Sequence, residues 1–236
     1  MKHRAIILGV ITALAVVAYI LSPERHFFRS LFPLTDGQIV SVYDDRSDGG
    51  LSDARMGMVD SVLDFECELK GDSSKDAWCG LIWNLDPEQK GNYANWTLVD
   101  SVIVELSGKN IDEIVIKIWT YDPDVTDSQK KLTFRQLIKE VPVTKEMQRI
   151  AIPMEQFYVP DYWFEQTGAD KKLTQRHQEA VARVEIIPGW KMPRNAAFSL
   201  KIRKIEVLGV SNFALGILLG VFLFIAILAI GGKKKK

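Results

Sequence analysis

The C-terminal part of the chain contains an uninterrupted apolar run, Phe213–Ile230, with no charged residue and no proline. At about 1.5 Å of rise per residue, a helix of this length spans about 27 Å, close to the roughly 30 Å hydrocarbon core of a bilayer. A surface helix of a soluble domain carries a polar stripe, and this run has none. Lysines beside a membrane span stay in the cytoplasm, so Lys233–Lys236 orient it. Residues 210–236 therefore predict a C-terminal transmembrane helix with a cytoplasmic lysine tail.

A second apolar run, Ala5–Leu21, follows Lys2, His3 and Arg4. A cleaved secretory signal has the same charged start and apolar middle, but it needs small residues at a cleavage site. This run ends in Tyr-Ile-Leu-Ser-Pro, and its A-x-A triplet lies in the middle. We therefore favour an uncleaved transmembrane anchor over residues 1–22, with a cleaved signal as the alternative. The uncleaved form is an integral protein of the plasma or inner membrane with two spans, both termini cytoplasmic, and a periplasmic or extracellular middle.

The net charge of zero and the hydrophobic content of 47% are averages over the whole chain, which combines two apolar helices with a polar middle. Roughly 185 residues lie between the spans, which is enough for one domain with its own core. Acidic and basic residues are interleaved there, so the charge pattern gives no reason to expect a nucleic-acid partner. We expect one extracytoplasmic domain over residues 38–209, a membrane-proximal linker over residues 23–37, and the lipid bilayer as a partner.

Apolar and charged residues alternate strictly over residues 63–69, which is the period-two pattern of a half-buried strand. Residues 71–75 indicate a turn, and residues 76–84 indicate the return strand of a hairpin. Cys67 and Cys79 then lie opposite each other, where cross-strand side chains are close. Disulfides persist outside the cytoplasm. We therefore predict a structural Cys67–Cys79 disulfide, with two buried free thiols as the alternative.

Residues 100–106 and 111–119 are expected to form a second hairpin. Three isoleucines share one face of the second of these strands, whereas Lys117 and Trp119 lie on the other, continued by Tyr121. A face that carries a lysine does not belong to the core. We therefore expect Trp119 and Tyr121 on the outer side of the sheet.

The remaining alternating segments predict further strands, and residues 156–167 are expected to be irregular. The alternation slips at Arg203 and Lys204, which indicates a β-bulge. Roughly eight strands separated by turns, with no long amphipathic helix, predict an all-β antiparallel jelly-roll sandwich flanked by an N-terminal and a C-terminal transmembrane α-helix. The further strands are expected at residues 38–43, 134–143, 147–154, 182–187 and 197–208.

Signatures of metal and enzyme sites are weak. Asp44–Gly50 contains three carboxylates and two glycines, but Arg46 stands where an EF-hand needs its second carboxylate, so a polar turn is the better interpretation than a calcium loop. The chain has no H-E-x-x-H, no G-x-S-x-G, no P-loop and no dinucleotide fingerprint. We therefore expect no metal, no cofactor and no enzymatic activity.

The order of several segments carries a resemblance. An acidic, glycine-containing opening at residues 44–52 is followed by Trp78-Cys79-Gly80-Leu81, by a strand led by residues 96–101, by residues 148–153, and by a closing pair of strands. This order resembles the galactose-binding-like jelly rolls, a group that holds many carbohydrate-binding modules and the complex I assembly (CIA30-type) domains. The resemblance implies a jelly roll over about residues 38–208. It departs from the group at Lys204-Ile205-Glu206, where many members have an aspartate-asparagine pair.

Sugar sites place aromatic rings against the apolar faces of pyranoses and polar groups around the hydroxyls. Several residues of this chain suit such a surface, on the outer strand face and in the loops beside it. The alternative is a merely solvated face whose aromatic rings pair across strands. The candidate ligand-binding residues are Lys117, Trp119, Tyr121, Glu105, Arg183, Glu185, Trp163 and Trp190.

Two functions fit these predictions. In the first, a membrane-anchored extracytoplasmic domain binds or senses a ligand, with carbohydrate favoured, and is coupled to the cytoplasm through the second span. In the second, the protein is a non-catalytic membrane subunit or assembly factor whose jelly roll docks another membrane protein, as the CIA30-type resemblance implies.

Overall fold

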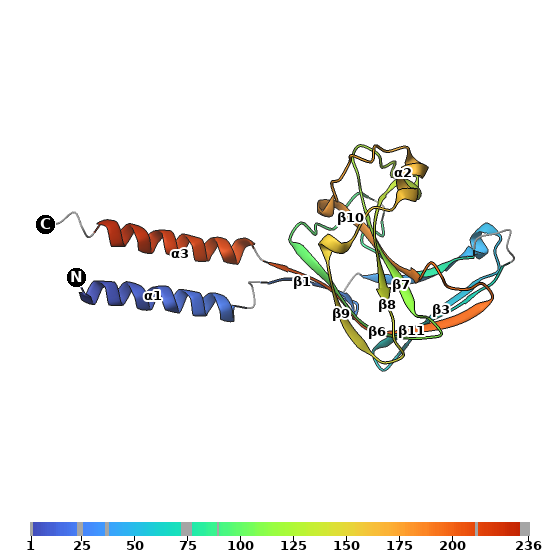
Figure 1. Cartoon of the computed structure of the whole chain (residues 1–236), viewed down its shortest axis with the longest axis horizontal. Coiled ribbons are helices and arrows are strands. Elements are labelled where there is room, and N and C mark those ends of the chain that lie inside the picture. Colours follow the sequence, from blue (N-terminus) through green and yellow to red (C-terminus); the bar gives the residue numbers. More distant parts are fainter. Residues whose placement is uncertain are drawn as a thin grey trace.

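The computed structural model describes residues 2–22, 26–35, 38–71, 77–88, 90–210 and 212–231. Two antiparallel β-sheets pack face to face, and two helices leave the same end of this sandwich side by side (Figure 1). The mostly β prediction of a sandwich is therefore confirmed. The lysine tail, Lys233–Lys236, and the expected turn at residues 72–75 lie outside the described residues.

Within the described residues, sheet A has six strands and sheet B has five. Sheet A follows the order β3-β4-β11-β6-β9, and β1 pairs with the C-terminal part of β11; sheet B follows the order β2-β5-β10-β7-β8. Sheet A comprises β1 (His26–Phe32), β3 (Asp53–Val59), β4 (Val62–Leu69), β6 (Val99–Lys109), β9 (Gln148–Pro153) and β11 (Ala196–Val210). Sheet B comprises β2 (Ile39–Asp44), β5 (Cys79–Asn84), β7 (Glu113–Thr120), β8 (Arg135–Pro142) and β10 (Val181–Pro188).

The core lies between the two sheets, and the alternation along each strand fills it. In β7 the three isoleucines Ile114, Ile116 and Ile118 are fully buried in it, as their shared face predicts. From sheet A, Phe65 and Phe198 meet edge to face with their ring centroids 5.9 Å apart. Each such side chain stabilises the fold by about 1.5–3 kcal/mol relative to an exposed position. This core holds sheet B rigidly in place and thereby positions the outer face of that sheet.

Both expected hairpins are wrong. β4 pairs with β3 and β11 in sheet A, whereas β5 pairs with β2 and β10 in sheet B. In the same way β6 belongs to sheet A and β7 to sheet B. Alternation reports which side of a strand is buried, and a strand facing its chain neighbour across a sandwich buries the same side as one beside it in a hairpin. The pattern therefore could not choose between the two arrangements.

The predicted disulfide between Cys67 and Cys79 is confirmed, but the strands that it joins are not neighbours in a hairpin. The two Cα atoms are 6.6 Å apart, and both side chains are buried in the core. Since β4 and β5 lie in opposite sheets, the bond links sheet A to sheet B across the core instead of joining two neighbouring strands.

The segment expected as a membrane-proximal linker contains a strand of the sandwich. β1 runs antiparallel to β11, from His26 beside Val210 to Phe32 beside Ile205. Leu31 and Phe32 are fully buried, so this segment is anchored in the core of the sandwich. The bulge expected at Arg203 is confirmed by a register shift between Ile202 and Lys204.

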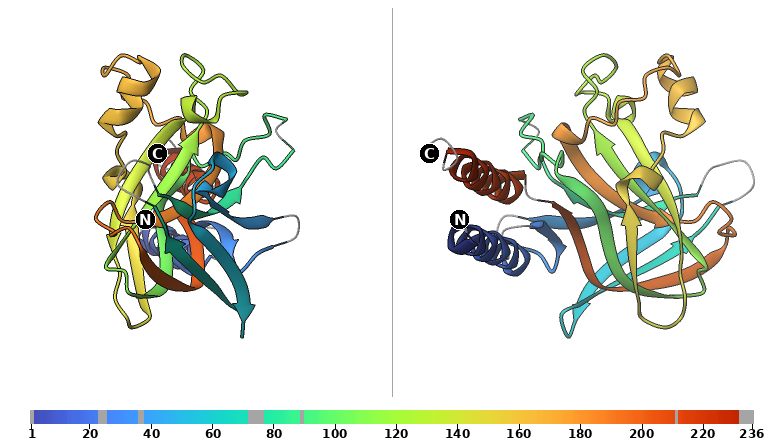
Figure 2. Two further views of the ribbon diagram at one scale, coloured as in Figure 1. Left: turned by 90° about the vertical axis from the view of Figure 1, so that its right-hand side faces the viewer. Right: turned by 60° about the vertical axis from the view of Figure 1, so that its left-hand side comes forward.

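The two helices continue directly from this strand pair. α1 (Lys2–Leu21) precedes β1, and α3 (Asn212–Gly231) follows β11; the helices contact each other and lie alongside in both views (Figures 1 and 2). Among the described residues one helix, over Phe213–Ile230, is long and apolar enough to cross a membrane, with a mean hydropathy of 3.0. The apolar part of α1, Ile6–Leu21, is shorter.

Short helices occupy several connections. Residues 156–167, expected to be irregular, contain α2 (Asp161–Thr167), which ends at Gly168 in the left-handed conformation. The acidic turn is a 3₁₀ helix, η2 (Asp45–Asp48), whose buried Asp45 accepts hydrogen bonds from Ser52 and from the Trp78 amide. These internal bonds confirm the polar-turn interpretation. The other 3₁₀ helices are η3 (Lys131–Thr133), η4 (Met154–Gln156) and η5 (Gln178–Ala180).

We expect the disulfide to contribute substantially to stability, because it closes a loop with a sequence separation of 12 in the unfolded chain. Loop-closure entropy for such a length is worth about 3 kcal/mol. The Cys67→Ala, Cys79→Ala double variant should lose about this amount in urea unfolding followed by tryptophan fluorescence. Wild-type protein under reducing conditions should behave in the same way, and an unchanged unfolding midpoint in both would contradict a structural role.

Candidate functional site

The outer face of sheet B gathers charged and aromatic side chains from its two central strands. On β10 and β7, Arg183 is paired with Trp119 and Glu185 with Lys117, so all four side chains point to the same side. The next strand, β5, adds Asn84 beside Arg183. The structure therefore brings together four of the eight candidate residues as one block.

Glu185 is the centre of this block. Its carboxylate lies 3.2 Å from Arg183 Nε and accepts a hydrogen bond of 3.3 Å from the Tyr43 hydroxyl. The residue is 5% exposed, and burial raises the pKa of its carboxyl, while the charges of Arg183 and Lys117 oppose that rise. Burial also lowers the pKa of Lys117 and of Arg183, with the Glu185 charge acting in the opposite direction. The opposite charges in this block therefore favour each other's ionised forms, against the effect of burial.

Trp119 is on the predicted face, but it is not the exposed platform that was expected. The Arg183 guanidinium lies over its ring, with Cζ 3.7 Å from the ring centroid, and Trp119 is only 4% exposed. The alternation placed the ring correctly on the outer side. It could not show that a neighbouring strand covers that side with a charged side chain, which packs well on an aromatic face.

Two rings, Tyr162 of α2 and Trp190 of the loop after β10, cover the Lys117 end of the block. The Lys117 ammonium lies 5.9 Å from the Tyr162 ring centroid and 5.5 Å from that of Trp190, and these two rings meet edge to face. Tyr162 donates a hydrogen bond to Gln136 of β8, and Trp190 donates one to Glu140 of the same strand. Trp190 is 51% exposed, so it remains a candidate contact residue at the rim.

A small pocket of about 120 Å³ opens at the other end, beside Arg183. Three aromatic rings stand at this end: Tyr93 and Tyr121 are stacked with centroids 5.2 Å apart, and Phe134 meets both of them edge to face. All three rings are half-buried and therefore accessible in part. The pocket is lined by Ile82, Asn84, Asp86, Tyr93, Ser128, Lys131, Phe134, Ala182 and Arg183.

Two candidate residues lie elsewhere. Glu105 is on β6 in sheet A, where it accepts a hydrogen bond from Arg203, so it does not belong to this face. Trp163 is fully buried in α2, and its indole donates to the carbonyl of Phe134. It therefore supports the loop that carries Phe134 and offers no surface for a ligand.

A buried ion pair fixes the same loop. Arg135 is fully buried, donates two hydrogen bonds to Asp122, and lies 4.6 Å from the Trp163 ring centroid. Asp122 directly follows Tyr121, and Arg135 directly follows Phe134. The pair therefore holds both ends of the β7–β8 connection, and with them Phe134, which lines the pocket, and Tyr121, which stacks on the pocket ring Tyr93.

Sequence reasoning missed five residues of this face. Tyr93 and Lys131 stand outside the predicted strands, where no periodic pattern marks a side chain as part of a surface. Phe134 is the first residue of the predicted strand 134–143 and lies just before β8, so the pattern did not show which surface its ring joins. Asn84 and Tyr43 lie on predicted strands, but their role depends on which strands are neighbours in sheet B. The correct strand order would have brought both of them beside β10.

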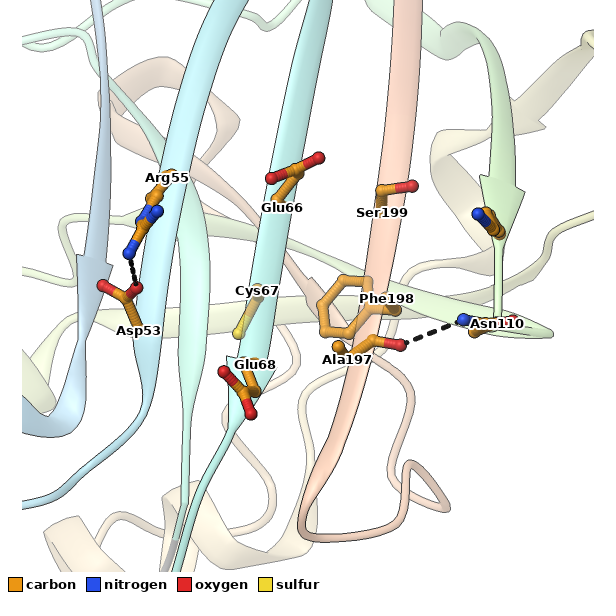
Figure 3. A pocket seen from close by; sticks show the side chains of 10 residues that line it. Asp53, Arg55, Glu66, Cys67, Glu68, Asn110, Ala197, Phe198 and Ser199 are labelled. Atoms are coloured by element: carbon orange, nitrogen blue, oxygen red, sulfur yellow. Dashed lines mark hydrogen bonds and ion pairs between the residues drawn. The ribbon is translucent and has the colours of Figure 1, made fainter.

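The larger hollow in the molecule, of about 310 Å³, lies on the outer face of sheet A and is less suited to a ligand (Figure 3). Several of its charged side chains form ion pairs: Arg55 pairs with Asp53 at 2.6 Å, and Glu68 pairs at 2.7 Å with Lys70, which stands outside the hollow. Its one ring, Phe198, is 3% exposed because it faces the core. Among the described residues, no cluster of three or more His, Cys, Asp or Glu could hold a metal ion.

The fold is similar to that of solved carbohydrate-binding modules. A family 11 module of the cellulase Lic26A-Cel5E of Clostridium thermocellum matches with a TM-score of 0.51 and 9% identity, over 78% of this chain and 95% of that one. The solution structure of CtCBM11 matches with a TM-score of 0.52 and 12% identity, over 81% and 99%. A family 30 module matches with a TM-score of 0.50 and 11% identity, over 79% and 89%.

Identities this low show the fold alone, and at that level they confirm the resemblance drawn from the sequence. No protein-family model matches the sequence, and no curated protein matches it.

The two tryptophans of this face give a matched test of the geometry. Trp119→Ala should reduce the free energy of unfolding by about 3 kcal/mol, since it removes a buried ring. Trp190→Ala removes a half-exposed ring and should change it by no more than about 1 kcal/mol. Urea unfolding of both variants, followed by circular dichroism, measures the difference, and equal losses would contradict the burial of Trp119.

Proposed function

We propose that this protein is a non-catalytic carbohydrate-binding protein whose ligand lies on the outer face of sheet B. The observation that carries the proposal is the pocket beside Arg183, where three aromatic rings stand next to a side-chain amide and charged groups. Pyranose rings have apolar faces and hydroxyl edges, and they need both kinds of partner at one site.

The geometry of the pocket supports this assignment. Tyr93 and Phe134 line it and supply aromatic surface, while Asn84 and Lys131 supply hydrogen-bond donors. Its volume of about 120 Å³ suits part of a single sugar ring, with the rest of a chain lying along the open face above Ile82. The exposed Trp190 at the far end of the same face offers a second ring for a longer ligand.

The structural neighbours support the proposal in a limited way. A family 11 module of similar fold, with a TM-score of 0.50 and 9% identity, was solved in complex with a β-1,3-1,4-mixed-linked tetrasaccharide. That protein binds its glycan on a sandwich of the same kind. For this chain, glycan binding is therefore proposed from its own side chains, namely the rings and polar groups described above.

We also propose that the domain is held outside the cytoplasm by α1 and α3 as two membrane spans. The disulfide fits an oxidising compartment, and α3 has the length and composition of a span. α1 and α3 leave the sandwich side by side, so both helices would enter the bilayer together. β11 runs through the centre of sheet A directly into α3, which offers a path from the domain to the second span.

The docking-subunit alternative has one observation in its favour. The β3–β4 hairpin exposes Met56, Met58 and Val59 at 41%, 59% and 59%. Exposed apolar side chains on a hairpin are a feature of protein contact sites. This hairpin belongs to sheet A, so a docked protein would leave the outer face of sheet B open.

A glycan array probed with the full chain in detergent tests the binding proposal. We expect at least one oligosaccharide to bind, and Tyr93→Ala to weaken it about tenfold, which corresponds to about 1.4 kcal/mol. Tyr158→Ala removes an exposed ring outside the pocket and serves as the matched control. Binding that survives Tyr93→Ala unchanged, or no binding to any glycan, would contradict the proposal.

A further inference from the structure

The pocket is lined by two cations, Arg183 and Lys131, and by one carboxylate, Asp86. Lys117 and Arg183 both have Glu185 as a nearby carboxylate, and its negative charge opposes the lowering of the pKa that burial causes in each. Glu185 is buried, and the side chain of Arg183 is only 15% exposed. Two cations that share one carboxylate leave an uncompensated positive charge in a poorly solvated place, which is costly unless an anion joins them.

Two other carboxylates near this face, Asp86 and Glu140, already accept hydrogen bonds from other groups. Asp86 lines the pocket, but its two oxygens accept hydrogen bonds from the amides of Lys90 and Gly91 in its own loop. Glu140 accepts from the Tyr158 hydroxyl and the Trp190 indole. Neither carboxylate is therefore free to rotate toward Arg183 without breaking two hydrogen bonds.

Arg183 lines the pocket with a side chain that its neighbours hold in one orientation. Trp119 packs under its guanidinium plane, and Glu185 lies beside its Nε, so the orientation of the side chain is fixed. Among the described residues, no ion pair or hydrogen bond engages its two terminal nitrogens. The exposed Lys131 lines the same pocket and adds a second cation at its mouth.

We propose that this pocket binds an anionic sugar, and specifically the carboxylate of a uronic-acid unit, with Arg183 and Lys131 as the groups that select it. A fixed guanidinium matches a carboxylate in size and planarity and binds it with two parallel hydrogen bonds. The rings of Tyr93 and Phe134 contact the sugar, and the amide of Asn84 contacts a hydroxyl. This inference rests on the proposed carbohydrate-binding function and names the class of its ligand.

The experiment compares acidic and neutral forms of the same glycan. The full chain in detergent micelles is titrated calorimetrically with oligosaccharides of galacturonate, glucuronate, and mannuronate with guluronate. Each is paired with its carboxyl-reduced form, which keeps the sugar and the linkages and removes the charge. A neutral β-1,3-1,4-glucan tetrasaccharide is included. We expect at least one uronate to bind ten times more tightly than its reduced partner, or better.

Two variants test whether Lys131 and Arg183 produce the preference for acidic over neutral glycans. Lys131→Gln changes an exposed side chain and should lower the acid-to-neutral affinity ratio severalfold without affecting folding. Arg183→Lys keeps the positive charge but loses the bidentate geometry, and it should lower the ratio further. Lys201→Gln, an exposed lysine on the outer face of sheet A, is the matched control and should leave the ratio unchanged.

The outcomes separate this inference from the function on which it rests. If reduced or neutral glycans bind as tightly as the uronates, the protein binds carbohydrate and the inference is wrong. If Lys201→Gln lowers the ratio as much as Lys131→Gln, the preference is a general charge effect and the assigned pocket is wrong. If no glycan of any kind binds, the proposed function fails and the inference fails with it.

Discussion

The ion cluster around Glu185 determines how the outer face of sheet B is built. Its carboxylate holds Arg183, the guanidinium of Arg183 covers Trp119, and Lys117 on the other side carries the rings of Tyr162 and Trp190. Removing one partner from such a buried pair costs about 3–5 kcal/mol, because the remaining charge is stranded away from water. The face is therefore a fixed layer of charged and aromatic side chains, and the candidate pocket lies where this layer ends.

Three other interactions keep this face in register with the rest of the chain. The Cys67–Cys79 bond ties β5, the strand next to β10, to sheet A across the core. The buried Arg135–Asp122 pair holds the connection that carries Tyr121 and Phe134. The β1–β11 pair joins the sandwich to both helices. The fold thus connects the candidate binding face, through the core, to the helix pair at its base.

The sequence was informative about faces and weak about neighbours. Period-two alternation placed Ile114 inside and Lys117 outside. The disulfide was predicted from a hairpin that does not form, and the bond exists because both cysteines face the core from opposite sheets. The pairing of β4 with β5 was wrong because alternation does not distinguish a hairpin from two strands that face each other across a sandwich. For the same reason the sequence could not show that Arg183 covers the ring of Trp119, since the two residues are distant in the chain and become neighbours only in sheet B. Tyr93 and Phe134 stand beside strands rather than within them, and no local pattern marked them as part of a site.

The most direct test of the account is to locate the bound ligand on one of the two sheets. Hydrogen–deuterium exchange of the full chain, with and without the tightest-binding oligosaccharide of the array, reports which backbone segments become protected. The account predicts protection at the end of β5, around Tyr93 and in the β7–β8 connection over residues 121–134. Protection confined to the sheet A hollow, at residues 53–55, 66–68 and 197–199, would contradict it.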